Sequence, residues 1–205
     1  MIGVLDYGVG NVGAFLRIYH SNNIEATSVK SPRDFSKIDR IILPGVGSFD
    51  SAMKKLNESG LRKTLDKFVL NDNYPLLGVC IGMHMLGISS DEGNSEGLGY
   101  INGITKKIGT ADDNKKILIP HMGWNNIKVA AKDSIWSNIN MDEGFYFLHS
   151  FYFEPNDTAS IIGISEYHKS FACAIRHNEV YGFQFHPEKS LSNGIQLLIN
   201  FAEDR

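Results

Sequence analysis

The chain has 205 residues, 42% of them hydrophobic, which is enough to bury a substantial core as one domain without disulfides. Its 20 Lys and Arg against 23 Asp and Glu give a net charge of -3, which excludes a broad electrostatic attraction to nucleic acid or to an anionic membrane. No apolar run reaches the roughly 20 residues that a membrane-spanning helix needs. With two cysteines and no leader-like N-terminus, we expect a single domain over residues 1–205 in the reducing cytoplasm.

The first half of the chain alternates short apolar strands with helical patterns. Strands are expected at 2–6, 24–29, 40–43 and 75–79, and helices at 12–20, 49–56, 61–70 and from 81 to about 88. Strands that alternate with helices are typical of a parallel sheet covered on both faces. We therefore predict an α/β fold with a doubly wound, mostly parallel central sheet and flanking helices.

The second half is dominated by short β-like runs, several of which we expect to be antiparallel. They lie at 124–129, 145–149, 159–167, 171–177 and 180–185. The polar segment 109–116 is rich in Asp and Asn and predicts an exposed hairpin turn. A final helix is expected at 192–201, so the chain ends with antiparallel strands and one helix added to the parallel sheet.

Cys80 stands between two glycines, in Gly78-Val79-Cys80-Ile81-Gly82, where a predicted strand passes into a helix. This is the pattern of a nucleophile elbow, a tight turn that exposes the nucleophile above the sheet. A helix N-terminus also favours thiolate over thiol, and thiolate is the reactive form. The same five residues are compatible with a small buried cysteine in a tight turn, so the elbow alone does not decide.

A thiolate nucleophile needs a base, and the base needs an orienting group. His186-Pro187-Glu188 supplies both at the end of an alternating strand. Taken alone, the tripeptide is equally compatible with a surface pair. Cys173 is expected to be a small core residue. The remaining histidines show no paired metal-ligand spacing, so no metal and no cofactor are expected.

Together, these two motifs resemble the class I, triad-type glutamine amidotransferases. The resemblance implies that Cys80 attacks the side-chain amide of glutamine, that His186 is the acid and base, and that Glu188 orients it. Further segments covering most of the chain resemble one branch of that family, the glutaminase subunits of imidazole glycerol phosphate synthase in histidine biosynthesis. They are Asp6 to Asn11, Leu43 to Phe49, Pro120 to Asn125, Tyr146 to Ser150 and His186 to Ser190.

The resemblance also assigns roles around the nucleophile. The oxyanion hole would be formed by the N–H groups of Ile81 and Val46, the latter on a glycine-rich strand thought to reorient in the family. Pro-Gly-Val-Gly is otherwise a simple tight turn between a strand and a helix. The residues implied in substrate binding are Gly47, His84, Glu92, Ser150 and Phe151, with Glu92 on the amino group of glutamine.

One position departs from the family, which usually carries glutamine where this chain has His84. An imidazole cannot reproduce both hydrogen bonds of a planar amide. This keeps open a paralogous subunit that feeds another synthase, such as one that amidates a surface sugar. The resemblance further implies a (β/α)₈-barrel cyclase partner, contacted by Asn11, Trp124 and Lys189, that receives ammonia internally. Without the resemblance, Trp124 and Lys189 are compatible with a buried and a solvated side chain.

The sequence also bears on three functions other than a glutaminase. Gly8, Gly10 and Gly13 match the glycine spacing of a dinucleotide-binding turn, but the second strand ends in Val29-Lys30-Ser31 and lacks the expected acidic residue. A hydrolase or isomerase with the same elbow would make His-Pro-Glu a coincidence. A non-catalytic binding subunit would have no need of a complete triad.

Overall fold

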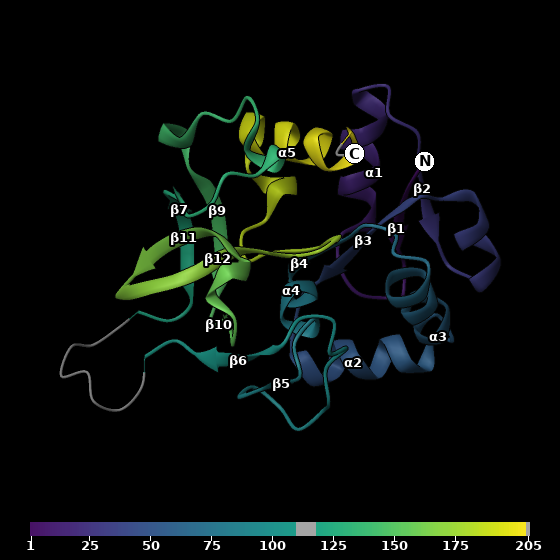
Figure 1. The fold of residues 1–205 in the computed structure, drawn as a ribbon, viewed down its shortest axis with the longest axis horizontal. Coiled ribbons are helices and arrows are strands. Elements are labelled where there is room, and N and C mark those ends of the chain that lie inside the picture. Colours follow the sequence, from purple (N-terminus) through teal and green to yellow (C-terminus); the bar gives the residue numbers. More distant parts are fainter. Residues whose placement is uncertain (110–117, 204–205) are drawn as a thin grey trace.

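The protein is built around a large mixed sheet with helices on both of its faces (Figure 1). A computed structural model describes residues 1–109 and 118–203. The predicted α/β class and mostly parallel sheet are confirmed. The turn expected at 109–116 lies, apart from Gly109, outside the described residues.

The elements follow the predicted order, with boundaries that differ by a few residues. The strands of the first half are β1 (Ile2–Leu5), β2 (Ala26–Val29), β3 (Arg40–Gly45), β4 (Leu76–Cys80) and β5 (Ser89–Ser90). Those of the second half are β6 (Gly103–Lys107), β7 (His121–Asn125), β8 (Lys128–Val129), β9 (Phe145–His149), β10 (Phe151–Pro155), β11 (Ile161–Tyr167), β12 (Lys169–His177) and β13 (Val180–Phe183). The helices are α1 (Val12–Ser21), α2 (Phe49–Glu58), α3 (Arg62–Asp66), α4 (Ile81–Met85) and α5 (Leu191–Glu203). Short helical turns are η1 (Pro32–Lys37), η2 (Lys67–Asn71), η3 (Ser134–Trp136), η4 (Met141–Glu143), η5 (Thr158–Ser160) and η6 (Pro187–Lys189).

The main sheet has eight strands in the order β2-β1-β3-β4-β13-β12-β11-β8. The first five run parallel to one another, and β12, β11 and β8 continue the sheet as antiparallel strands. The change follows from the connections, because β11 and β12 are joined by a tight turn at His168, whereas parallel neighbours need a long crossover. β4 and β13 are adjacent and parallel although about a hundred residues separate them along the chain.

The two faces of the parallel region are covered by different helices (Figure 1). α1 and α5 lie together on one face, where the Tyr19 hydroxyl donates a hydrogen bond to the Leu198 carbonyl at 3.1 Å. α2, α3 and α4 cover the other face. No helix in residues 1–109 or 118–203 has the length and apolar character needed to cross a bilayer.

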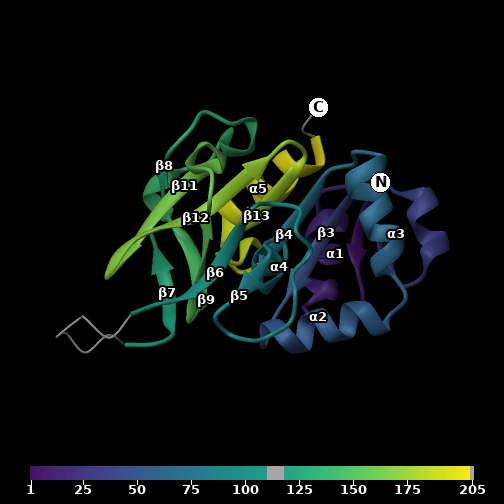
Figure 2. The same ribbon diagram turned by 60° about the horizontal axis from the view of Figure 1, so that its bottom comes forward.

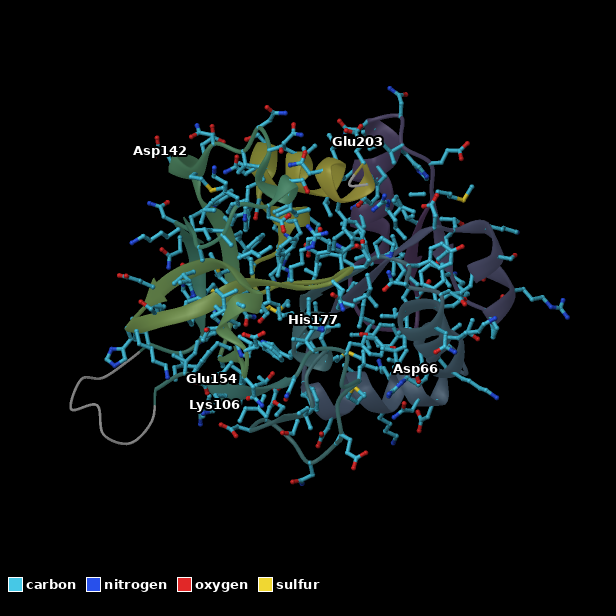
Figure 3. The ribbon with its side chains drawn as sticks, viewed as in Figure 1. Asp66, Lys106, Asp142, Glu154, His177 and Glu203 are labelled. Atoms are coloured by element: carbon cyan, nitrogen blue, oxygen red, sulfur yellow. The ribbon has the colours of Figure 1, made fainter. Side chains whose placement is uncertain are left out.

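Two small sheets lie beside the antiparallel end of the main sheet (Figure 2). β7 pairs with β9, and β6 lies between β10 and β5. Lys106 of β6 and Glu154 of β10 point toward each other as an ion pair (Figure 3). Two expectations are corrected here: 124–129 is not one strand, since β7 ends at Asn125 and β8 begins at Lys128, and β6 and β10 were not expected. The run 124–129 is divided because β7 pairs with β9 and β8 pairs with β11, a choice of partners that local sequence does not specify.

The junction between β4 and α4 is packed unusually closely by glycines. A Cβ added at Gly82 would lie 1.9 Å from the Leu43 carbonyl oxygen on β3, and one added at Gly45 would lie 2.4 Å from the Gly82 nitrogen. One added at Gly78 would lie 2.6 Å from the Gly82 oxygen. Three glycines therefore let β3, β4 and the first turn of α4 approach to backbone contact, which sets the position of Cys80.

We expect Gly82→Ala to lower the free energy of unfolding by about 1–3 kcal/mol or more, because its methyl group would overlap backbone atoms that cannot move independently. Gly13→Ala in α1 is the matched control. Its methyl group would first meet the flexible Arg17 guanidinium at 3.4 Å, so the change should stay within about 1 kcal/mol. Urea unfolding of both variants measures the difference, and equal effects would contradict this account of the junction.

Candidate active site

Cys80 is the last residue of β4 and directly precedes α4. Its backbone has φ 56° and ψ -113°, a conformation that residues with side chains rarely adopt and that costs on the order of 1–3 kcal/mol. The side chain is 5% exposed, and Sγ hydrogen-bonds the Leu148 carbonyl oxygen at 3.7 Å. Strain of this kind at a strand-to-helix turn is the hallmark of a nucleophile elbow.

His186 follows β13, the parallel neighbour of β4, so its imidazole reaches the same sheet edge as Cys80. The Nδ1–H donates to Glu188 Oε1 at 2.8 Å, and the ring also hydrogen-bonds Cys80. The backbone is held on both sides, since the His186 N–H donates to Tyr146 O at 2.9 Å and the Ser190 hydroxyl donates to His186 O at 2.6 Å. The three predicted triad residues are thus brought together by β4 and β13.

The electrostatics of this group favour a charged imidazole. Burial lowers the pKa of His186, but hydrogen bonds and charge interactions with Cys80 and Glu188 outweigh it and raise that pKa well above its ordinary value. Glu188 is buried, and its second oxygen, Oε2, has no hydrogen-bond partner among the described residues. Its negative charge is therefore compensated mainly through His186. An imidazolium beside Sγ in turn stabilises a thiolate, the nucleophilic form of cysteine.

A cavity of about 280 Å³ opens directly above Cys80. It gathers most of the residues that the sequence predicted for oxyanion and substrate binding. The lining residues are Val46, Gly47, Cys80, Ile81, His84, Glu92, Pro120, Leu148, His149, Ser150, Phe151, His186 and Lys189. Segments from both halves of the chain thus converge on one cavity, with Cys80 and His186 in its lining.

The residues predicted for the oxyanion hole flank the nucleophile. Ile81 is the next residue in the chain, and Gly45 pairs with Cys80 in the sheet, which brings Val46 to the cavity edge. The Val46 side chain is 48% exposed, and Gly47 has φ 89°. The role of the two N–H groups stays a prediction.

Glu92 lines the cavity and contacts the start of α2. Its Oε2 accepts a hydrogen bond from the Phe49 N–H at 2.9 Å. Burial raises the pKa of this carboxyl, the Phe49 N–H lowers it, and the nearby Asp50 charge raises it. Within residues 1–109 and 118–203 its hydrogen bond engages only Oε2, and a partly buried carboxylate of this kind is suited to receive a cationic group.

The three residues predicted for the partner interface lie around this end of the sheet. Asn11 caps α1, accepting the Ala14 N–H at 3.1 Å, and its neighbour Gly10 packs closely against Pro44 of β3. Trp124 on β7 is 49% exposed. Lys189 lines the cavity with its ammonium 5.7 Å from the centre of the Tyr146 ring, a cation–π contact.

Sequence reasoning assigned no role to His121 and His149, although both stand in segments that it singled out. His149 lines the cavity, donates from Nδ1 to Phe151 O at 2.7 Å, and lies with Nε2 2.9 Å from His121 Nδ1. The Asn125 amide lies 3.2 Å from the remaining nitrogen of His121. This chain of hydrogen bonds fixes the backbone that presents Ser150 and Phe151. Only pairing of β7 with β9 brings the two histidines together.

The model of the family "Glutamine amidotransferase class-I" matches residues 3–204. The chain belongs to this family. The amidotransferase is 44% identical over 202 residues to the imidazole glycerol phosphate synthase subunit HisH of Leptospira borgpetersenii, covering 98% of this chain and 99% of the relative. It is 43% identical to a subunit named HisH 2 from Methanococcus maripaludis, covering 99% of each.

Solved amidotransferases share the fold at much lower sequence identity. A crystal structure described as glutamine amidotransferase superposes with a TM-score of 0.72 at 18% identity and covers 98% of both chains. This likeness bears on the fold alone. Within residues 1–109 and 118–203 of the amidotransferase, no three His, Cys, Asp or Glu side chains gather in a way that could hold a metal ion.

We expect His186→Ala to slow the alkylation of Cys80 by iodoacetamide at pH 6.5 about tenfold or more, because only thiolate reacts and few ordinary cysteines are ionised there. Mass spectrometry of the modified peptides gives the rate. Cys173 is an internal control, since it is fully buried and burial raises its pKa well above the ordinary value. Equal rates in both proteins would show that His186 does not activate Cys80.

Three buried histidines make the fold sensitive to acid. Burial lowers the pKa of His84 and His121 to about 4 and that of His149 to about 3, whereas unfolded histidine titrates near 6.5. The unfolded chain therefore binds more protons between these values, so stability falls as pH falls. His186 has a raised pKa, and its contribution is complete below about 6.5 and constant in this range.

We expect the free energy of unfolding to fall by at least about 1 kcal/mol per pH unit between pH 6.5 and 4.5, measured by urea unfolding. His121→Gln should reduce this slope because it removes one group that cannot be protonated in the folded state. His177→Gln, at an exposed position, should leave the slope unchanged. An undiminished slope in His121→Gln would count against the assignment of this buried ring as neutral.

Proposed function

We propose that this chain is the glutaminase subunit of imidazole glycerol phosphate synthase, which hydrolyses glutamine and passes the ammonia to a cyclase subunit in histidine biosynthesis. The observation that carries the proposal is the buried group of Cys80, His186 and Glu188, of which Cys80 and His186 line one cavity. Identity of 44% along almost the whole chain to a subunit of that name supports the pathway. We further propose a single amidotransferase domain, supported by a family match over residues 3–204.

The chemistry follows from the triad. The Cys80 thiolate attacks the side-chain carbonyl carbon of glutamine and forms a tetrahedral oxyanion, and His186 then gives its proton to the leaving nitrogen. Ammonia departs and a glutamyl thioester remains. His186, now neutral, takes a proton from water, which attacks the thioester. The C–S bond then breaks, and glutamate leaves as the thiolate beside protonated His186 is regenerated. Glu188 keeps the imidazole in orientation and stabilises its charged form through the 2.8 Å hydrogen bond.

The groups around the cavity suit a free amino acid. We assign the oxyanion to the N–H groups of Ile81 and Val46, each donor being worth on the order of 10²- to 10³-fold in rate. Glu92 would bind the substrate ammonium, supported by its partly buried carboxylate in the cavity lining. Gly47 and the backbone of Ser150 and Phe151 would bind the rest of the amino-acid end. A cavity of about 280 Å³ is small for a ligand site, which supports a substrate of this size.

We assign the partner, a (β/α)₈-barrel cyclase, to the face formed by Asn11, Trp124 and Lys189. Exposed apolar side chains on the same ribbon and turn support a protein contact, namely Met122 at 66% and Leu191 at 71% exposure. An enclosed transfer has a clear physical reason, because ammonia released into neutral water becomes ammonium and loses its nucleophilic lone pair. The free thiols of Cys80 and Cys173 support a reducing, cytoplasmic setting.

A second function is favoured by one observation, the imidazole of His84 where the family usually carries glutamine. It would be a paralogous subunit that supplies ammonia to another synthase, such as one that amidates a surface sugar. The chemistry at Cys80 would be the same, and only the partner would differ. The cyclase experiment below separates the two.

We expect Cys80→Ala to abolish glutamate release, by at least about 10³-fold, since the nucleophile is lost. Glutamate is measured with the purified chain alone, then with the cyclase from the same genome, with and without that cyclase's phosphoribosyl substrate. Cys173→Ala, a substitution of the same chemistry in the core, is the matched control and should keep most activity. Turnover retained by Cys80→Ala would remove Cys80 from its role.

The same experiment decides the partner. Low activity of the chain alone that rises sharply in the full mixture would establish the histidine pathway. Glutamate release that does not change when the cyclase is added would still support a glutaminase, but it would favour the paralogous subunit over the histidine pathway. Binding of Cys80→Ala to the cyclase should be unchanged, because the cysteine is 5% exposed and lies inside the cavity.

A further inference from the structure

A buried hydrogen bond joins the nucleophile helix to the strand that carries the catalytic histidine. His84 Nε2 lies 2.8 Å from Gln184 Oε1. His84 stands four residues after Cys80, one turn along α4. Gln184 directly follows β13 and stands two residues before His186. The bond therefore connects the two elements that must meet at the reacting sulfur.

The direction of this hydrogen bond is set by the chemistry of its partners. An amide oxygen can only accept, so His84 Nε2 must carry the proton. Burial lowers the pKa of His84 to about 4, although the Gln184 hydrogen bond raises it, which leaves the ring neutral with a bare Nδ1. The Gln184 backbone is itself anchored, since its N–H donates to Cys173 O at 2.9 Å in the neighbouring strand.

His84 is badly placed to bind the substrate directly in this arrangement. It borders the cavity but is only 1% exposed, and its Nδ1 is enclosed and has no hydrogen-bond partner among the described residues. Its other nitrogen is already engaged by Gln184. Gln184 is fully buried and does not line the cavity, so it cannot reach glutamine. What the pair can do is hold two backbone elements at one distance.

Such a link has a large effect on catalysis even though one neutral hydrogen bond adds only about 1 kcal/mol to stability. Cys80 is under backbone strain, with φ 56°, and α4 is a single short helix of five residues. A displacement of about 1 Å between a nucleophile and its base can cost on the order of 10²-fold in rate. The rate therefore depends on a fixed position of α4 against the segment that carries His186.

We propose that His84 and Gln184 are positioning residues, whose hydrogen bond braces the nucleophile helix against the strand of the catalytic histidine. The proposal rests on the proposed glutaminase function and deepens it. It changes the role of His84 from contact with glutamine to alignment of the triad. The substitution of the family's usual glutamine by histidine then concerns the geometry of catalysis and not the affinity for substrate.

The test compares kcat and KM for glutamine in His84→Leu, Gln184→Met and the double variant, each in complex with the partner that activates the wild type. Gln184→Met keeps the approximate length of the side chain and removes its amide group, including the acceptor, so it carries the test if His84→Leu does not fold. Gln196→Leu is the matched control, since it removes a 2.8 Å side-chain hydrogen bond to Asn200 within α5, and neither residue lines the cavity. Circular dichroism and thermal unfolding verify the fold of every variant.

We expect each single variant to lower kcat by about 10- to 100-fold with KM within about twofold of the wild type. The double variant should be no worse than the poorer single one, because both break the same bond. His84→Gln, which places an amide N–H donor opposite Gln184, should have a kcat near the wild-type value. The control should match the wild type.

Three results would overturn the brace. One is a raised KM with unchanged kcat in His84→Leu, which would return His84 to substrate binding. Another is full activity in Gln184→Met, and the third is losses in the two single variants that multiply in the double variant. Each of these results can be interpreted whichever biosynthetic pathway the chain serves.

Alkylation of Cys80 by iodoacetamide at pH 6.5 separates this proposal from the proposed function, because it needs no glutamine. A broken brace should slow alkylation in both single variants, as it separates the sulfur from the His186 imidazolium. If the wild type releases no glutamate with any partner, the proposed function fails. The alkylation rates of the variants would still test whether the His84–Gln184 bond positions Cys80. Unchanged alkylation in both variants, beside normal glutamate release by the wild type, would overturn the brace alone.

Discussion

The close approach of β3, β4 and α4 is the constraint on which the site depends. Gly45, Gly78 and Gly82 bring these backbones into contact, and the Cys80 residue between them adopts a strained φ of 56°. The strain is supported by the buried parallel strands on both sides, β3 and β13. Because the sheet cannot relax locally, the thiol is held at the strand edge where the other catalytic groups arrive.

The electrostatics of the triad depend on burial from the distant second half of the chain. Glu188 has one oxygen bonded to His186 and one with no partner among the described residues, so its charge acts mainly on the imidazole. In water the same pair would be screened and weak. Burial by itself lowers the pKa of His186, but the hydrogen bonds and charges of Cys80 and Glu188 outweigh it and raise that pKa.

Two sets of buried polar side chains near the triad also support its surroundings through hydrogen bonds. The His121 and His149 chain supports the Ser150 and Phe151 backbone on one side of the cavity, and the His84 and Gln184 pair supports α4 beneath it. All three histidines have lowered pKa values through burial and stay neutral. Neutral imidazoles can hold such bonds without adding charge near the nucleophile.

The sequence by itself predicted the alternation of strands and helices, the elbow around Cys80 and the residues proposed as the triad, because these are local patterns or motifs. Most cavity residues followed only from resemblance to the family. Tertiary structure alone decided the pairing of β4 with β13, the separate β7 and β9 ribbon and the two histidine contacts. These join residues 20 to 104 positions apart, and no local periodicity encodes which partners meet.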